Sequence, residues 1–86
     1  MKQIEKILEE LGFEFLYSSE NGIFAKRKKA GLVIYFDIER KKGIYFVEKA
    51  ESISGIIKTI KSEFKGCKAV IEYIKIWIKL YYIIKQ

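Results

Sequence analysis

The spacing of hydrophobic residues predicts a short amphipathic helix at the start of the chain. Ile4, Ile7, Leu8 and Leu11 recur at positions i, i+3, i+4 and i+7, which places them on one helical face. Gly12 follows directly, where a glycine commonly ends a helix. We therefore expect a helix over residues 1–11.

Four segments with alternating apolar and polar residues come next and predict strands over 13–17, 23–28, 32–39 and 44–48. The connecting residues are rich in glycine, serine, asparagine and lysine, as turns are. The third segment has the clearest alternation, and one of its faces is expected in the core: Leu32, Ile34, Phe36 and Ile38. These segments predict an antiparallel meander of three or four strands.

The remaining residues predict two helices. Ser52 and Ser54 are candidate N-caps for a helix reaching about Lys65, and Gly66 would end it. Its apolar stripe would consist of Ile53, Ile56, Ile57, Ile60 and Phe64.

The last segment, 67–85, has the isoleucine, tyrosine and tryptophan content of a strand. Its polar residues favour a helix, because Lys68, Glu72, Lys75 and Lys79 fall in one narrow helical stripe and would split between two strand faces. The other sides of this helix are apolar, so they are either wrapped by the first two helices or meet another chain. The candidate interface residues are Tyr73, Ile74, Trp77, Ile78 and Tyr81.

The predicted fold class is therefore α+β, with an N-terminal helix, an antiparallel sheet of three or four strands and two C-terminal helices. Eighty-six residues are enough for one domain, which we assign to 1–86. Half of the residues are hydrophobic, so the chain can form a packed core.

Composition excludes several kinds of chemistry. The chain has no histidine and a single cysteine, which leaves no basis for histidine acid–base catalysis, a disulfide framework or most zinc sites. We expect no metal, no cofactor and no enzymatic activity. The unpaired Cys67, the absence of a secretory signal and the lack of a long apolar stretch predict a cytoplasmic protein that does not insert into membranes.

A formal charge of +6 favours polyanionic partners. The basic residues gather in two segments, Lys26-Arg27-Lys28-Lys29 and Arg40-Lys41-Lys42, which we place at successive turns. Successive turns of a meander lie at opposite ends of the strand between them, so about 25 Å separates the segments. Spaced lysines of this kind can contact nucleic-acid phosphates, although turns also collect lysine for solubility.

Two weaker patterns involve the sheet. Tyr35 and Tyr45 could share an exposed face and stack on bases, or pack as ordinary sheet residues, depending on strand register. Glu39-Arg40-Lys41, with Asp37 nearby, has the Glu-x-Lys spacing of metal-dependent nucleases, but this spacing is common by chance.

The segment Ile4-Glu5-x-Ile7-Leu8-x-x-Leu11-Gly12-Phe13, with the hairpin after it, resembles HicA-type mRNA interferases over residues 1–60. The resemblance implies a double-stranded-RNA-binding-domain-like α-β-β-β-α topology and an RNA-facing sheet. The family's catalytic histidine, expected near residues 18–22, is absent here, so the resemblance implies no activity.

Two functions follow as hypotheses. The first is a non-enzymatic domain that binds the nucleic-acid backbone, DNA or RNA without sequence specificity, through the two basic segments and forms a dimer through the last helix. The alternative is a small protein-binding inhibitor or accessory factor of a phage, virus or plasmid, which blocks a host nuclease or a nucleic-acid-guided defence complex.

Overall fold

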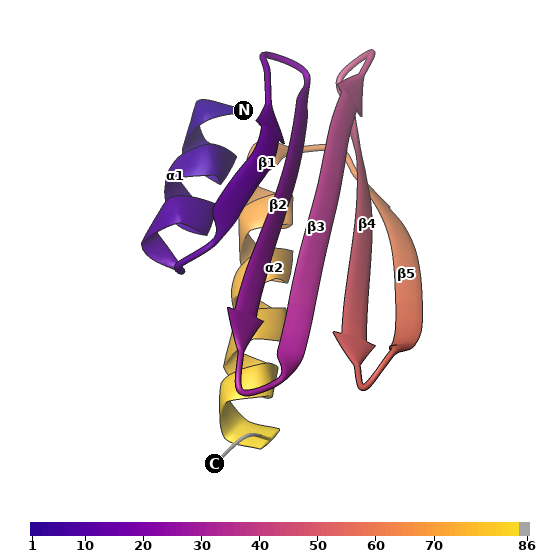
Figure 1. The fold of residues 1–86 in the computed structure, drawn as a ribbon. Coiled ribbons are helices and arrows are strands. Elements are labelled where there is room, and N and C mark those ends of the chain that lie inside the picture. The colour runs from indigo at the N-terminus through magenta and orange to yellow at the C-terminus, as the bar shows by residue number, and fades with distance from the viewer. Residues whose placement is uncertain (85–86) are drawn as a thin grey trace.

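The computed structural model describes residues 1–84, with side chains for residues 1–80, as a five-stranded antiparallel sheet with two helices (Figure 1). The strands follow one another in chain order across the sheet. The elements are α1 (Lys2–Glu10), β1 (Glu14–Ser18), β2 (Gly22–Lys29), β3 (Leu32–Lys41), β4 (Ile44–Ile53), β5 (Ile56–Phe64) and α2 (Cys67–Ile84). The α+β class, the N-terminal helix, the antiparallel meander and the helix at the end of the chain are confirmed.

Helix α1 ends as its glycine predicts. Gly12 adopts a φ of +85°, and its N–H donates to the carbonyl of Glu9 at 3.0 Å. The N–H of Phe13 donates to the carbonyl of Leu8 at 2.9 Å, which completes a Schellman motif. This reversal brings the chain directly into β1, with Phe13 and Leu8 both buried.

Three identical two-residue turns set the register of the sheet. Ala30-Gly31, Lys42-Gly43 and Ser54-Gly55 have positive φ at both positions, the geometry of type I′ turns. Each turn joins strands that pair without a bulge, so Lys29 lies opposite Leu32, Lys41 opposite Ile44 and Ile53 opposite Ile56. Because side chains alternate along each strand, this register decides which residues face the helices and which form the open face.

The core lies between the sheet and the two helices. Leu32, Ile34, Phe36 and Ile38 of β3 are buried there, as predicted. Ile4 and Leu8 of α1 cover the sheet towards β1, while Val70, Ile74 and Ile78 of α2 pack behind its middle. Both helices therefore occupy one face, and the opposite face is open.

Lys49 is the one charged residue buried in this core among the described side chains, with 1% of its surface exposed. Its Nζ lies 3.5 Å from the ring centroid of Trp77 and 3.8 Å from Oε2 of Glu51. Burial lowers the pKa of Lys49, an effect that the nearby Glu51 carboxylate opposes. The ring face and the carboxylate stabilise a charge that would otherwise be costly to bury.

The predicted helix between residues 52 and 65 is wrong. Residues 56–64 form strand β5, which pairs with β4 along its whole length, so the sheet has five strands and one C-terminal helix follows it. Ser54 is the first turn residue of a hairpin and caps no helix. In a strand, the supposed apolar stripe divides: Ile56, Ile60 and Phe64 lie on the helix side of the sheet, and Ile57 lies on the open face.

The apolar surface of helix α2 is divided between the core and solvent. Ile74 and Ile78 are buried in the core of the chain itself, whereas Ile76 and Leu80 are exposed, at 59% and 42%. Tyr73 and Trp77 are half-buried against the same chain, where Tyr73 lies 4.9 Å from Phe64 between ring centroids. The side chain of Tyr81 lies outside the described side chains. No helix in the described part of the chain is long and apolar enough to span a membrane.

The type I′ geometry predicts the response of Gly55 to substitution. A Cβ at Gly55 would meet nothing within 4 Å, so only its φ of +84° penalises a side chain. We expect Gly55→Ala to lower the free energy of unfolding by about 1 kcal/mol, and Gly55→Asn to cost clearly less because asparagine tolerates positive φ. Urea denaturation of both variants measures this difference, and equal losses would contradict the turn assignment.

Lys49 predicts an unusual pH dependence of stability. The native state holds the Lys49 proton less tightly than the unfolded chain, so wild-type stability gains as the pH rises through the lowered pKa towards 10.5. We expect Lys49→Met to be at least as stable as wild type at pH 7 and to lack that gain. Denaturation at pH 7 and pH 10 tests this, with the exposed Lys61→Met as the control. A loss above about 1 kcal/mol in Lys49→Met at pH 7 would show that the ring and carboxylate contacts outweigh burial.

Candidate nucleic-acid interface

The first basic segment lies within a strand and not at a turn. Residues 26–29 are the last four of β2, and the turn follows at Ala30-Gly31. Lys26 and Lys28 point to the open face, while Arg27 and Lys29 point to the helix side. The segment therefore presents two charges to each face of the sheet. Lys26 lies opposite Glu14 of β1, which partly balances its charge.

On the helix side, Arg27 of β2 lies at the same hollow as two lysines of α2. Together they line an open hollow of about 420 Å³ with Glu10, Leu11 and Ile78. Lys75 and Lys79 are exposed and one helical turn apart, whereas Arg27 is half-buried beside the turn that ends α1. We call Arg27, Lys75 and Lys79, with Lys29 on the same face at the end of β2, the basic end of the molecule.

In the second basic segment one residue is hydrogen-bonded to a neutral side chain and one is paired with a carboxylate. Nη2 of Arg40 donates to Oδ1 of Asn21 at 3.0 Å, and Nζ of Lys41 lies 3.3 Å from Oε2 of Glu39. Only Lys42 occupies a turn. This segment therefore offers less charge to a phosphate than its three basic residues indicate.

An acidic group lies between the two basic segments on the open face. Asp37, Glu39, Glu48 and Glu63 line a hollow of about 620 Å³ with Phe46 and Lys61 among the other lining residues. Asp37 lies directly opposite Glu48 in the β3–β4 ladder. Burial raises the pKa of Asp37, and the charges of Glu39 and Glu48 raise it further.

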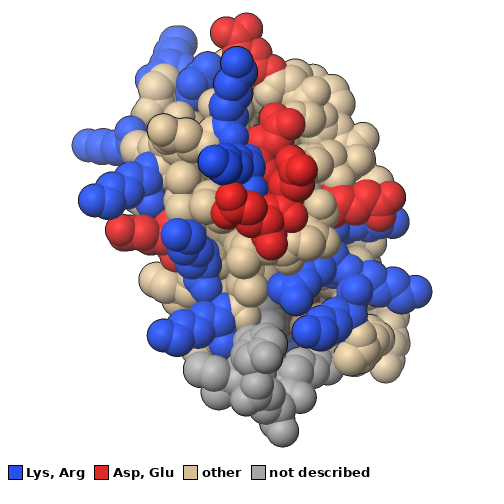
Figure 2. All heavy atoms as spheres, turned by 90° about the vertical axis from the view of Figure 1, so that its left-hand side faces the viewer, with Lys and Arg blue, Asp and Glu red and all other residues tan. Residues whose placement is uncertain are grey.

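These charges prevent one strand of phosphates from running between the basic segments over the open face, because it would cross the acidic group. The charge is also divided on the α1 side, where Figure 2 shows lysine and arginine side chains on either side of a central acidic group. The two segments are thus separated by acidic residues, and the basic end gathers cations from two elements.

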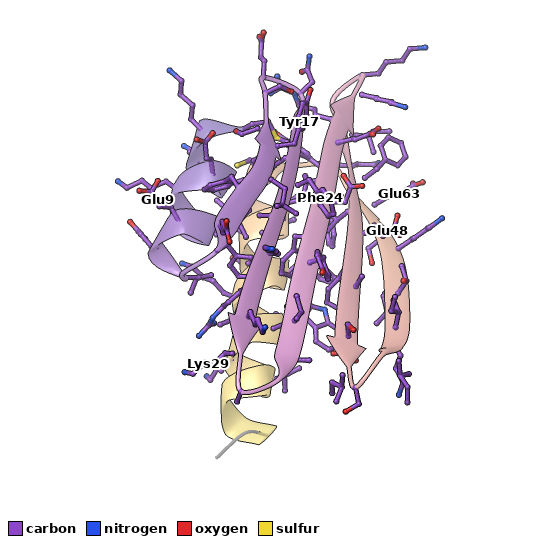
Figure 3. The ribbon with its side chains drawn as sticks, viewed as in Figure 1. Glu9, Tyr17, Phe24, Lys29, Glu48 and Glu63 are labelled. Atoms are coloured by element: carbon purple, nitrogen blue, oxygen red, sulfur yellow. The ribbon has the colours of Figure 1, made fainter. Side chains whose placement is uncertain are left out.

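The two tyrosines considered for base stacking lie on opposite faces. Tyr35 is on the open face, where its ring stacks on Phe24 with centroids 5.9 Å apart. Tyr45 is buried on the helix side. Tyr17 and Phe24 lie on neighbouring strands of the open face, while Lys29 is at the far end of β2 (Figure 3).

The structure places the two charged ends of the Glu-x-Lys spacing against each other. Lys41 is engaged with Glu39 itself, within the same motif. Within residues 1–84, no three histidine, cysteine or acidic side chains are grouped so that they could hold a metal ion.

Lys75 and Lys79 are the residues of this site that sequence reasoning missed. Their spacing already placed them on one polar stripe of the last helix. Their position beside Arg27 depends on how α2 packs across the sheet, and no local pattern carries that information.

Comparison with protein-family models, with curated proteins and with solved structures gives no match. The likeness to HicA-type mRNA interferases therefore remains a resemblance, and the observed order of one helix, five strands and one helix also differs from the α-β-β-β-α order that it implied.

The acidic group predicts a pH-dependent change in stability. Asp37 has a raised pKa in the native state, so its charge opposes folding at pH values above that pKa and has no effect once it is protonated. We expect Asp37→Asn to raise the free energy of unfolding at pH 7, by at most about 0.5 kcal/mol because solvent screens this exposed carboxylate, and to leave it unchanged at pH 3. Paired urea titrations at the two pH values measure this. Glu20→Asn, in the exposed β1–β2 loop, is the control.

Proposed function

We propose that this protein is a non-enzymatic domain that binds the nucleic-acid backbone through the basic end. The observation that carries the proposal is the convergence of Arg27 from β2 with Lys75 and Lys79 from α2 around one hollow. Cations from two elements that are distant in sequence can contact several phosphates at once. Glu10 is the one carboxylate that lines this hollow.

The residue types of the basic end favour contacts to the nucleic-acid backbone and not the recognition of base edges. Three of the four residues of the basic end are lysine, a point charge that binds phosphate without the bidentate geometry that arginine uses on guanine. On the open face, Lys26 pairs across the ladder with Tyr35, whose ring is stacked on Phe24. This aromatic surface lies on the opposite face of the sheet from Arg27, Lys75 and Lys79, so phosphate contacts at the basic end do not depend on it.

The alternative, a protein-binding inhibitor or accessory factor of a nucleic-acid-handling complex, would use the same charge if the partner surface were acidic. Binding energy placed in apolar side chains, with a weak salt dependence, would favour this alternative.

Fluorescence anisotropy with labelled single- and double-stranded DNA and RNA, repeated across a salt series, tests the proposal. We expect log affinity to fall linearly with log salt, with a slope that reports the number of phosphates contacted. The double variant Lys75→Gln/Lys79→Gln should weaken binding and reduce the magnitude of this slope by about 2.

The matched control is Lys41→Gln/Lys42→Gln, which removes the same net charge from the other basic segment and should change the slope much less. Equal effects of the two pairs would show that net charge alone drives binding. No binding at low salt would exclude a nucleic-acid role for the basic end.

A further inference from the structure

We propose that two copies of this chain pair edge to edge through β5, antiparallel and about a two-fold axis at Ile60, to form a continuous ten-stranded sheet. This inference goes beyond the proposed nucleic-acid binding and does not depend on it, because β5 contributes none of the residues of the basic end.

Strand β5 is a long and regular edge with exposed isoleucines. It is the last strand of the sheet, it pairs with β4 without a bulge, and it contains no proline. Its isoleucines are exposed: 66% for Ile56, 70% for Ile57 and 42% for Ile60. Long, regular and apolar edges of this kind favour pairing with another strand.

The opposite edge of the sheet is different. Strand β1 has five residues, against nine in β5, and its ladder is interrupted between Phe15 and Tyr17. Short length and a bulge both hinder pairing with another chain. A head-to-tail contact between β5 and β1 of another copy would also leave free edges and extend into a filament, whereas β5 with β5 closes as a dimer.

The turn before β5 decides which backbone groups are free. In a two-residue hairpin the residues flanking the turn form a hydrogen-bonded pair, here Ile53 and Ile56. Even-numbered residues of β5 therefore direct their N–H and C=O groups towards β4. The odd-numbered residues Ile57, Thr59, Lys61 and Glu63 direct theirs to the free edge.

Only one symmetric register pairs the whole strand. Ile60 is the midpoint of Ile56–Phe64, so an axis at Ile60 places Ile56 opposite Phe64 of the second copy. In this register the outward residues pair as Ile57 with Glu63 and Thr59 with Lys61, which gives about eight backbone hydrogen bonds between the chains.

The charges of β5 are compatible with this register and disfavour a shift of the axis towards Lys61. With the axis at Ile60, Lys58 faces Ser62 and Lys61 faces Thr59 of the second copy, so no like charges are directly opposite. An axis moved by one residue to Lys61 would place Lys61 opposite its own copy, which is unfavourable. Within each chain, Lys58 lies opposite Glu51 and Lys61 opposite Glu48. These neighbouring carboxylates reduce the repulsion by which edge lysines discourage pairing.

Sedimentation equilibrium across a range of protein concentrations gives the first test. We expect a species of twice the 10.1 kDa chain mass that dissociates on dilution. A monomer at every concentration up to the millimolar range would overturn the proposal.

Cysteine cross-linking then tests the register, in a Cys67→Ser background that leaves one thiol per chain. Residues on the axis form a non-hydrogen-bonded pair with Cα atoms about 4.5 Å apart, within the range of a disulfide. Ile60→Cys should therefore give a disulfide-linked dimer on mild oxidation. Ile57→Cys is the control, because its two copies would be about 20 Å apart along the ladder.

Ile57 is more exposed than Ile60, so random collisions would cross-link Ile57→Cys at least as readily. Equal cross-linking of the two variants, or cross-linking of Ile57→Cys alone, would overturn the register.

A pair of charge substitutions adds a test that needs no oxidation. Ile60→Lys places two lysines opposite each other on the axis and should raise the dimer dissociation constant about tenfold or more. Ile57→Lys, on the same strand and also at an exposed position, faces Glu63 of the second copy and should retain the dimer. Equal weakening by both substitutions would exclude the proposed register. If the dimer survives Ile60→Lys, a surface other than β5 joins the chains.

Discussion

The register imposed by the three two-residue turns is the constraint on which the rest of this structure depends. With positive φ at both positions, each turn permits one alignment of its flanking strands and no slippage by a single residue. A slip of one residue in β3 would turn Phe36 and Ile38 out of the core and bring Asp37 and Glu39 into it. The turns thus decide the composition of both faces of the sheet, and the helices cover the face that receives the apolar residues.

The same register separates charges that are adjacent in the sequence. A run of four basic residues reads as one patch along the chain, yet a strand sends alternate members to opposite faces. Only the helix-side half of this run gains further cations, because α2 brings Lys75 and Lys79 to Arg27. On the open face, the ladder sets Asp37 against Glu48 and surrounds them with further carboxylates. A basic protein consequently has an acidic centre on its open face, so net charge alone says little about where a polyanion can bind.

Much of the fold could be predicted from local patterns. Alternation identified the buried face of β3, and four polar positions identified α2 against the β-propensity of its residues. Strand β5 was missed because the isoleucines at 53, 56, 57 and 60 have helical spacing. The spacing of the turn glycines indicates the hairpin that was missed. Gly31, Gly43 and Gly55 lie twelve residues apart, and each is preceded by a residue that adopts positive φ. A repeat of ten strand residues and two turn residues predicts a hairpin at Ser54-Gly55.

Burial of single residues was harder to foresee than the elements. The residues near Lys49 in the sequence give no indication that this charged side chain is buried. It belongs to the core because Trp77, distant in the chain, covers it. Conversely, the apolar surface expected on the last helix is only partly taken up by the core, since Ile76 and Leu80 stay exposed, and further exposed isoleucines occur on β5. Two helices can cover only part of a five-stranded sheet. Helix α2 reaches the end of β5, where Phe64 lies against Tyr73, but Ile56, Ile57 and Ile60 stay exposed and the outer edge of β5 is unpaired within the described chain. The exposed surface is therefore a consequence of the number of strands. That number could not be predicted from the sequence pattern, because the isoleucines of β5 have helical spacing.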